Sequence, residues 1–145
     1  MTLLNTRDTQ SCIYLDAVRI RHIVFVEEQR VPLEIEMDAY ETQCVHFVLY
    51  NEDKVAVATA RLLPDRENAG LVILQRMAVL SEQRGNGYGR KVIEAVEKYA
   101  KQHQFSEIVL HAQLTAHDFY AKMGYMPFGD EFEEAGIRHI SMKKK

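Results

Sequence analysis

The feature that most constrains the fold is a glycine-rich turn, Gln83 to Arg90, placed between an apolar run and an amphipathic segment. The run before it, 71–80, has the composition of a buried strand. In the segment after it, about 88–103, apolar residues recur at three- and four-residue spacing, which predicts a helix. A glycine turn between a strand and a helix directs backbone N–H groups and the positive end of the helix dipole to one place. The turn therefore predicts an anion site.

Two other kinds of glycine loop do not fit this turn. A dinucleotide-binding fingerprint, G-x-G-x-x-G, needs glycine where this chain has Arg90. A P-loop needs a different glycine spacing and a lysine, and both are missing. The remaining pattern is Arg84-x-x-Gly87-x-Gly89. A tight turn that uses glycine only for its backbone freedom stays open as an alternative.

Composition indicates one globular domain spanning residues 1–145. Of these residues, 47% are hydrophobic and 27% are charged, which is ordinary for a folded domain. The net charge of −3, with no basic cluster except the terminal 143–145, argues against a nucleic-acid partner or a membrane surface. No apolar run approaches the roughly 20 residues of a membrane span, and none has the features of a signal peptide. We therefore expect a cytoplasmic protein.

Cysteine and histidine placement predicts neither a disulfide nor a metal site. Cys12 and Cys44 are far apart and outside any C-x-x-C motif, so free thiols are expected. The six histidines are scattered without the spacing of metal ligands. We therefore predict no metal.

The remaining patterns predict a mixed sheet with helices on its faces. In chain order they indicate an additional strand at 3–6, a helix between 12 and 30, a loop or short helix at 33–42, strands at 45–50 and 55–62, a strand at 108–112, a helix at 115–123, and short strands at 125–128 and 137–142. The middle strands form an antiparallel meander, whereas 71–80 and 108–112 form a parallel pair joined by a right-handed crossover. The predicted fold class is α/β (α+β), a mixed, mostly antiparallel sheet of six to seven strands flanked by about four helices.

A second motif lies about 30 residues after the turn, namely Ala116-x-x-Phe119-Tyr120-x-Lys122-x-Gly124-Tyr125. The two motifs together resemble the GNAT superfamily of N-acetyltransferases, whose patterns are [Q/R]-x-x-G-x-[G/A] and A-x-x-F-Y-x-K-x-G-[F/Y]. The resemblance covers the chain from about residue 17 to residue 142. Segments at 25–32, 36–38, 46 and 132–139 are also similar to the ElaA-like branch of small GNAT proteins, and a GNAT-like single-domain fold is implied.

The resemblance implies acetyl-CoA as a co-substrate and a set of residues that hold it. The residues expected at the pyrophosphate, largely through backbone N–H groups, are Arg84, Gly85, Asn86, Gly87, Tyr88, Gly89 and Arg90. Met77, Ala78 and Val79 are expected to pair by main chain with the pantetheine arm. A backbone N–H near Val79 is the implied oxyanion donor. Tyr120 matches the family tyrosine that faces the CoA sulfur, while a tyrosine packed on the sheet with its hydroxyl capped stays open.

Acetyl transfer to an amine requires a deprotonated amine, a stabilised oxyanion and a proton for the thiolate. An alkylamine with a pKa of about 10.4 is neutral in only about one molecule per few thousand at pH 7. A tyrosine pKa of about 10 lies above the roughly 8.5 of a thiol, so Tyr120 is expected to donate a hydrogen bond more than a full proton. The candidate bases are His111, Glu36, Asp38 and His46.

Each candidate base also has a structural interpretation. The alternative is that His111 and His46 are hydrogen-bonded core histidines and that the carboxylates form a solvated face. An ordered water molecule is an alternative to any of these side chains as the base. His111 is preferred because it ends the parallel strand beside the expected cleft.

The acceptor itself is not identified by the sequence. Glu34, Glu36 and Asp38 suit a cationic amine, whereas Arg61 and Arg76 suit a carboxylate on the acceptor. The predicted function is direct acetyl transfer, in a ternary complex, to a primary amine of a small molecule or peptide. A CoA-binding regulatory module and a nucleotide or phosphate binder are the alternatives, and a homodimer is left open.

Overall fold

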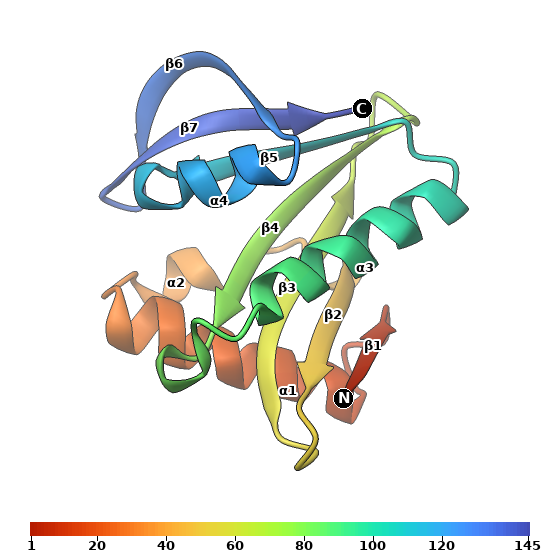
Figure 1. Cartoon of the computed structure of the whole chain (residues 1–145), viewed down its shortest axis with the longest axis vertical. Coiled ribbons are helices and arrows are strands. Elements are labelled where there is room, and N and C mark those ends of the chain that lie inside the picture. The colour runs from red at the N-terminus through yellow and green to blue at the C-terminus, as the bar shows by residue number, and fades with distance from the viewer.

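One seven-stranded sheet organises the computed structural model, which describes residues 1–145 (Figure 1). The strand order is β1-β2-β3-β4-β5-β7-β6, and only β4 and β5 run parallel. The strands are β1 (Thr2–Thr6), β2 (Val45–Tyr50), β3 (Ala56–Pro64), β4 (Leu71–Val79), β5 (Glu107–Gln113), β6 (Met126–Glu134) and β7 (Ile137–Lys144). The helices are α1 (Cys12–Arg21), α2 (Leu33–Glu36), α3 (Tyr88–Gln102) and α4 (His117–Lys122). The predicted fold class and the additional N-terminal strand are confirmed.

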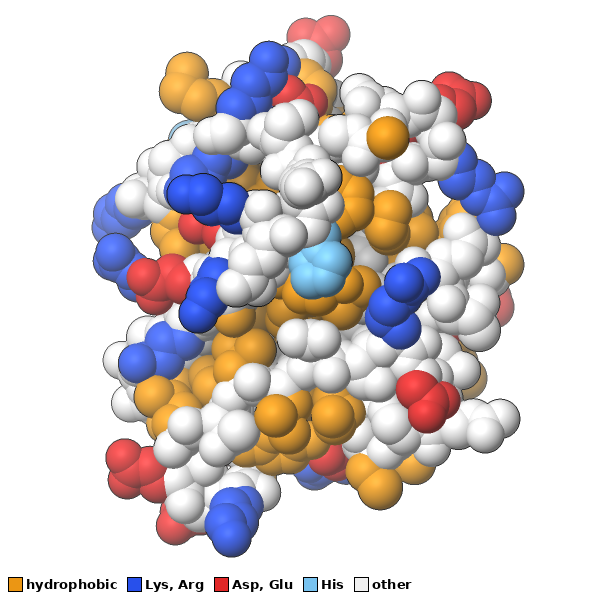
Figure 2. Space-filling model, turned by 90° about the vertical axis from the view of Figure 1, so that its right-hand side faces the viewer, with side chains coloured by type: hydrophobic (Ala, Val, Ile, Leu, Met, Phe, Trp, Pro, Cys, Tyr) orange, Lys and Arg blue, Asp and Glu red, His pale blue; other side chains and the backbone are white.

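Helices cover both faces of the sheet. The apolar stripe of α3, which includes Val92 and Val96, is buried in the same core cluster as Leu74 of β4 and Leu110 of β5. On the other face, α1 packs Ile20 into a smaller cluster of buried residues. None of the helices combines the length and the hydropathy that a membrane-spanning segment needs. On the face shown in Figure 2, charged side chains of both signs surround a central apolar area.

Two predicted elements differ from the structure. The helix expected between 12 and 30 is α-helical only to Arg21 and continues as a wider π-helix over His22–Glu28. The strand expected at 125–128 is a nine-residue strand, β6, joined to β7 by Ala135 and Gly136, which both have positive φ (53° and 77°). Two positive-φ residues make a hairpin turn that matches the twist of the strands. Our expectation missed it because alanine at positive φ is uncommon.

The sheet opens between its two parallel strands. Leu71 to Leu74 pair with Glu107 to Leu110, and beyond Leu74 the strands diverge (Figure 1). A bulge at this point, where Arg76 has a φ of 56°, shifts the pairing of β4 with β3. The last residues of β4 consequently have no strand partner on the β5 side. Their main-chain groups face a cleft.

Candidate functional site

The cleft between β4 and β5 is a cavity of about 840 Å³. Its walls come from both strands, the glycine turn, α4, the segment after α1 and the tip of the β6–β7 hairpin. The sequence-predicted site residues that line it are Met77, Ala78, Val79, Arg84, Gly85, Gly87, Tyr88, Gly89, Arg90, His111 and Tyr120. Asn86 is not among the lining residues, and its side-chain amide donates to the Gln83 carbonyl instead (3.0 Å). The structure thus brings together His111, Tyr120 and all but one of the residues expected to hold CoA, whereas the candidate base His46 does not line the cavity.

The glycine turn presents an uninterrupted row of free backbone donors. The first backbone hydrogen bond of α3 runs from Lys91 N–H to the Gly87 carbonyl (3.2 Å), and none of the N–H groups of residues 85–90 donates a hydrogen bond within the chain. Gly85 and Gly87 have φ values of 86° and 76°, which side chains rarely adopt. A Cβ on Gly89 would lie 3.2 Å from the Met77 side chain. This backbone suits an anion at the helix dipole.

Arg84 ties the turn to its surroundings. Its Nη1 and Nη2 donate to the two carboxylate oxygens of Glu28 (2.8 and 2.9 Å), and its Nε donates to the Val79 carbonyl (3.0 Å). The hydrogen bond from Arg84 holds the pKa of Glu28 below its usual range. Glu28 ends the π-helix, so this ion pair connects the first helical segment to the end of β4.

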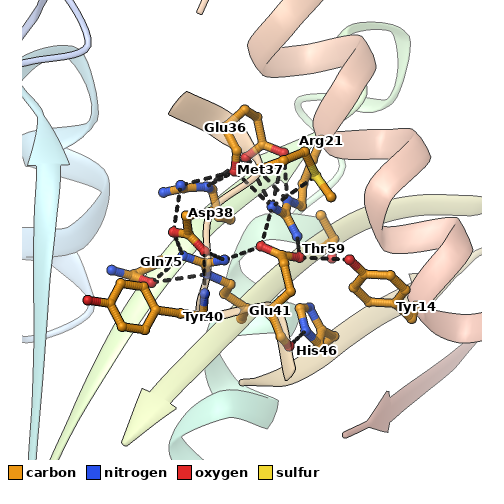
Figure 3. A network of polar contacts seen from close by, with 12 residues as sticks. Tyr14, Arg21, Glu36, Met37, Asp38, Tyr40, Glu41, His46, Thr59 and Gln75 are labelled. Carbon is orange, nitrogen blue, oxygen red and sulfur yellow. Dashed lines mark hydrogen bonds and ion pairs between the residues drawn. The ribbon is translucent and has the colours of Figure 1, made fainter. Parts of the chain in front are cut away.

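A network of mostly buried charges lies on the α2 side of the cavity (Figure 3), and three of its members, Glu36, Asp38 and Arg76, line the cavity floor. It alternates three arginines with three carboxylates, namely Arg21, Arg61, Arg76, Glu36, Asp38 and Glu41. The side chains of Arg21 and Arg61 are each only 1% exposed. The charges balance within the network, which is what allows such burial.

Glu41 is the centre of this network. It accepts from both terminal nitrogens of Arg21 (2.7 and 2.9 Å), from Arg61 and from the Tyr14 hydroxyl. Burial opposes its ionisation, but the hydrogen bonds and charges of the arginines outweigh burial and hold the pKa of Glu41 below its usual range. Burial raises the pKa of Tyr14 to about 12, so its hydroxyl stays a donor.

The network corrects several sequence-based interpretations. Glu36 is buried and paired with arginines, so the acidic segment is not a solvated face, and neither Glu36 nor Asp38 is free to act as a base. Arg61 is fully buried and cannot meet an acceptor carboxylate. His46 is buried, and its Nε2 donates to the Glu41 carbonyl (2.9 Å), which supports its structural interpretation. Burial lowers the pKa of His46.

His111 has a different environment. Its side chain is 42% exposed, so the core interpretation is wrong for this residue. Nδ1 lies 3.1 Å from Oε1 of Glu134 at the hairpin tip. A carboxylate only accepts, so Nδ1 carries the proton and Nε2 is left as the basic nitrogen. The hydrogen bond from His111 lowers the pKa of Glu134. The geometry is that of a base oriented by a carboxylate.

Glu134 and His139 line the cavity, and our sequence reasoning included them only in the ElaA-like segment 132–139, without a role in the site. His139 donates from Nδ1 to the Ile137 carbonyl (2.7 Å), and its Nε2 lies 3.7 Å from Oε2 of Glu134. Glu134 and His111 are 23 residues apart, and only the β5-β7-β6 pairing brings them together. Gly136 was the local signal that could have indicated the hairpin, because glycine readily adopts the positive φ of such a turn.

Tyr120 occupies the α4 wall. It is 7% exposed, and its ring packs edge-on against Phe119 and Tyr125. Its hydroxyl makes no hydrogen bond within the chain, so the capped-tyrosine interpretation is wrong. Burial raises the pKa of Tyr120. The hydroxyl is thus a neutral donor available to a bound molecule.

Comparisons with known proteins agree with this geometry. Residues 22–145 match the family model described as "Acetyltransferase (GNAT) domain". Over 130 residues the chain is 38% identical to the "Uncharacterized N-acetyltransferase YjcF" of Bacillus subtilis, which covers 89% of this chain and 90% of that protein. The crystal structure of Escherichia coli ElaA superposes with a TM-score of 0.86 at 25% identity over the full length of both chains. An aminoglycoside 6′-N-acetyltransferase solved with coenzyme A shares the fold, with a TM-score of 0.72 at 14% identity over 99% of this chain and 96% of that one.

The buried network predicts a large cost for removing Glu41. We expect Glu41→Gln to lower the free energy of unfolding at pH 7 by roughly 3–5 kcal/mol, because two buried arginines lose their shared carboxylate. Urea unfolding measures this, with Glu52→Gln, in the exposed β2–β3 turn, as the control. Equal stability of the two variants would contradict the role of the network.

The same substitution has a defined pH dependence. The pKa of Glu41 is lower in the folded protein than the roughly 4.3 of an unfolded glutamate. Its contribution to stability is therefore complete above that pH and is lost as the pH falls through the folded-state pKa. The stability difference between wild type and Glu41→Gln should shrink in acid.

Proposed function

The chain belongs to the GNAT acetyltransferase family, and on that premise we propose that it transfers acetyl from acetyl-CoA directly to the primary amine of a small molecule or peptide. One observation carries the proposal. A single cavity joins an anion-binding helix N-terminus, an unpaired strand segment and an oriented histidine. The acetyl donor and the amine acceptor would meet where β4 and β5 separate.

The glycine turn supports the proposed CoA site. Its free N–H groups, added to the dipole of the 15-residue α3, suit the pyrophosphate. The pantetheine arm would pair with the main chain of residues 77–79, which has no strand partner on the cleft side. Arg84 would support the turn from outside, because its guanidinium is already bound to Glu28.

The proposed transfer needs no covalent enzyme intermediate. Nε2 of His111 takes a proton from the acceptor ammonium, and the amine nitrogen then forms the C–N bond with the acetyl carbon. A backbone N–H near Val79 stabilises the oxyanion. Collapse of the tetrahedral intermediate breaks the C–S bond, and the nitrogen releases its second proton to solvent, which leaves the neutral amide. The Tyr120 hydroxyl donates a hydrogen bond to the departing thiolate. The raised pKa of Tyr120 makes full proton transfer unfavourable, so the thiolate is finally protonated from solvent or His111.

An amine screen with acetyl-CoA tests the activity through release of free CoA thiol. We expect turnover with at least one class of primary amine. Tyr120→Phe should lower kcat by about tenfold or more, because the thiolate loses a charge-assisted hydrogen bond, with CoA affinity unchanged. Binding of acetyl-CoA without transfer to any amine would instead support the regulatory-module alternative.

The proposed anion site at the glycine turn predicts that Gly87→Val weakens CoA binding. A branched side chain at a φ of 76° strains the turn, so we expect CoA affinity to fall by about tenfold or more in calorimetry. Gly129→Val is a matched control, because Gly129 has a φ of 73° and, like Gly87, no atom within 4 Å of its added Cβ. Equal CoA affinity in both variants would overturn the loop assignment.

Glu134 is a positioning residue that acts through His111. We expect His111→Gln to lower kcat about a hundredfold and Glu134→Gln about tenfold, with the KM for acetyl-CoA unchanged. The double variant should be no slower than His111→Gln, because the carboxylate has no role without the imidazole. Steady-state kinetics measures all three variants. Additive losses would show that Glu134 does not act through His111.

A further inference from the structure

We propose that the acceptor carries a carboxylate as well as its amine, and that Nη1 of Arg76 binds this carboxylate while His111 receives the amine. The inference rests on the proposed function and names its substrate class. Arg76 is the only arginine of the buried network that lines the cavity, and one of its nitrogens has no partner within the chain.

Arg76 and His111 face the same opening of the sheet. Leu74 and Leu110 are the last paired residues of β4 and β5, so Arg76 and His111 both stand just beyond the pairing. Both line the cavity. Arg76 has a φ of 56°, an uncommon conformation for a residue other than glycine. Backbone strain of this kind is often found at binding sites.

The guanidinium of Arg76 is held on one side only. Its Nε pairs with Glu36 (2.6 Å), and its Nη2 donates to the Glu36 carbonyl (3.1 Å), the Ile35 carbonyl (3.3 Å) and Asp38 (3.3 Å). Nη1 has no partner within the chain and is not a buried atom. The side chain is 22% exposed. A fixed guanidinium with one free donor is preorganised for an anion, because little side-chain entropy remains to be lost.

The charges around the cavity favour a carboxylate at this position. Glu36 and Asp38 already face Arg21 and Arg61, and Glu34 does not line the cavity, so the acidic segment offers no free carboxylate to an ammonium group there. The cavity carboxylate that pairs with no arginine is Glu134, which lies with His111 on the other wall and is hydrogen-bonded to it. The hydrogen bond from His111 is the largest cause of the lowered pKa of Glu134, and the positive charge of Arg76 also lowers it. Arg76 on one wall therefore interacts electrostatically with Glu134 on the other. An acceptor with an anionic end and an amine end matches both walls.

Matched acceptors test the inference in the wild-type protein. A series of ω-amino carboxylates of increasing chain length is compared with the carboxamides of the same chains, with acetyl-CoA and detection of the CoA thiol. At the best chain length we expect kcat/KM to be at least about tenfold higher for the carboxylate, which gains a charge-assisted hydrogen bond. The best length also reports the separation of the two subsites.

Two variants assign the preference to Arg76. In Arg76→Gln the ratio of kcat/KM between carboxylate and carboxamide should fall to about one. Arg138→Gln removes the same charge from a half-exposed arginine that does not line the cavity, and it should keep the wild-type ratio. Because Arg76 also balances Glu36 and Asp38, urea unfolding checks that Arg76→Gln is folded. The wild-type comparison does not depend on this variant.

The outcomes separate the inference from the proposed function. Equal kcat/KM for both members of every pair overturns the inference and leaves the acetyltransferase activity in place. If no amine is acetylated, calorimetry of the CoA-bound protein decides. Tighter binding of the carboxylates than of the carboxamides supports the Arg76 site without the transfer reaction, and no such difference overturns both.

Discussion

The end of pairing between β4 and β5 at Leu74 is the constraint on which the other parts of the site depend. Parallel strands in a sheet normally continue side by side, because each unpaired N–H or carbonyl group needs another partner. Here the bulge at Arg76 turns β4 away from β5, and the backbone groups beyond it face a cavity. The same divergence sets the glycine turn, which follows β4, apart from His111 on β5. A ligand between them can therefore contact both strands.

The buried network keeps this opening in shape. Segment 33–43 has little regular structure, and it is held on the sheet mainly by charges. Arg21 comes from α1, Arg61 from β3 and Arg76 from β4, so the carboxylates of one short segment connect three elements. Buried ion pairs contribute little net stability compared with apolar packing, but an unpaired member is very costly. Such a network therefore specifies one arrangement of the floor.

Much of the fold was predictable, because local patterns agreed with it. The stripe of Val92, Val96 and Ala100 predicted α3, and the apolar run at 71–80 predicted β4. The π-helical extension of α1 was not predictable, since its apolar spacing also fits an α-helix. Ala135 concealed the hairpin, because alanine carries no signal for positive φ. The sequence around His111 and His46 does not distinguish the two residues. In the structure, however, His111 is partly exposed and His46 is fully buried.

The sequence by itself determined the strand, the glycine turn and the helix that make an anion site, since these depend on residues close together in the chain. It also determined the second motif, which places Tyr120 on a short helix after β5. Only the tertiary structure decided which ionisable residues are free and which are occupied. Arg61 and Arg76 look equivalent in sequence, yet Arg61 is buried among carboxylates, whereas Arg76 lines the cavity and has one nitrogen without a partner in the chain. Their difference depends on contacts with residues 20 to 40 positions away, which no local pattern records.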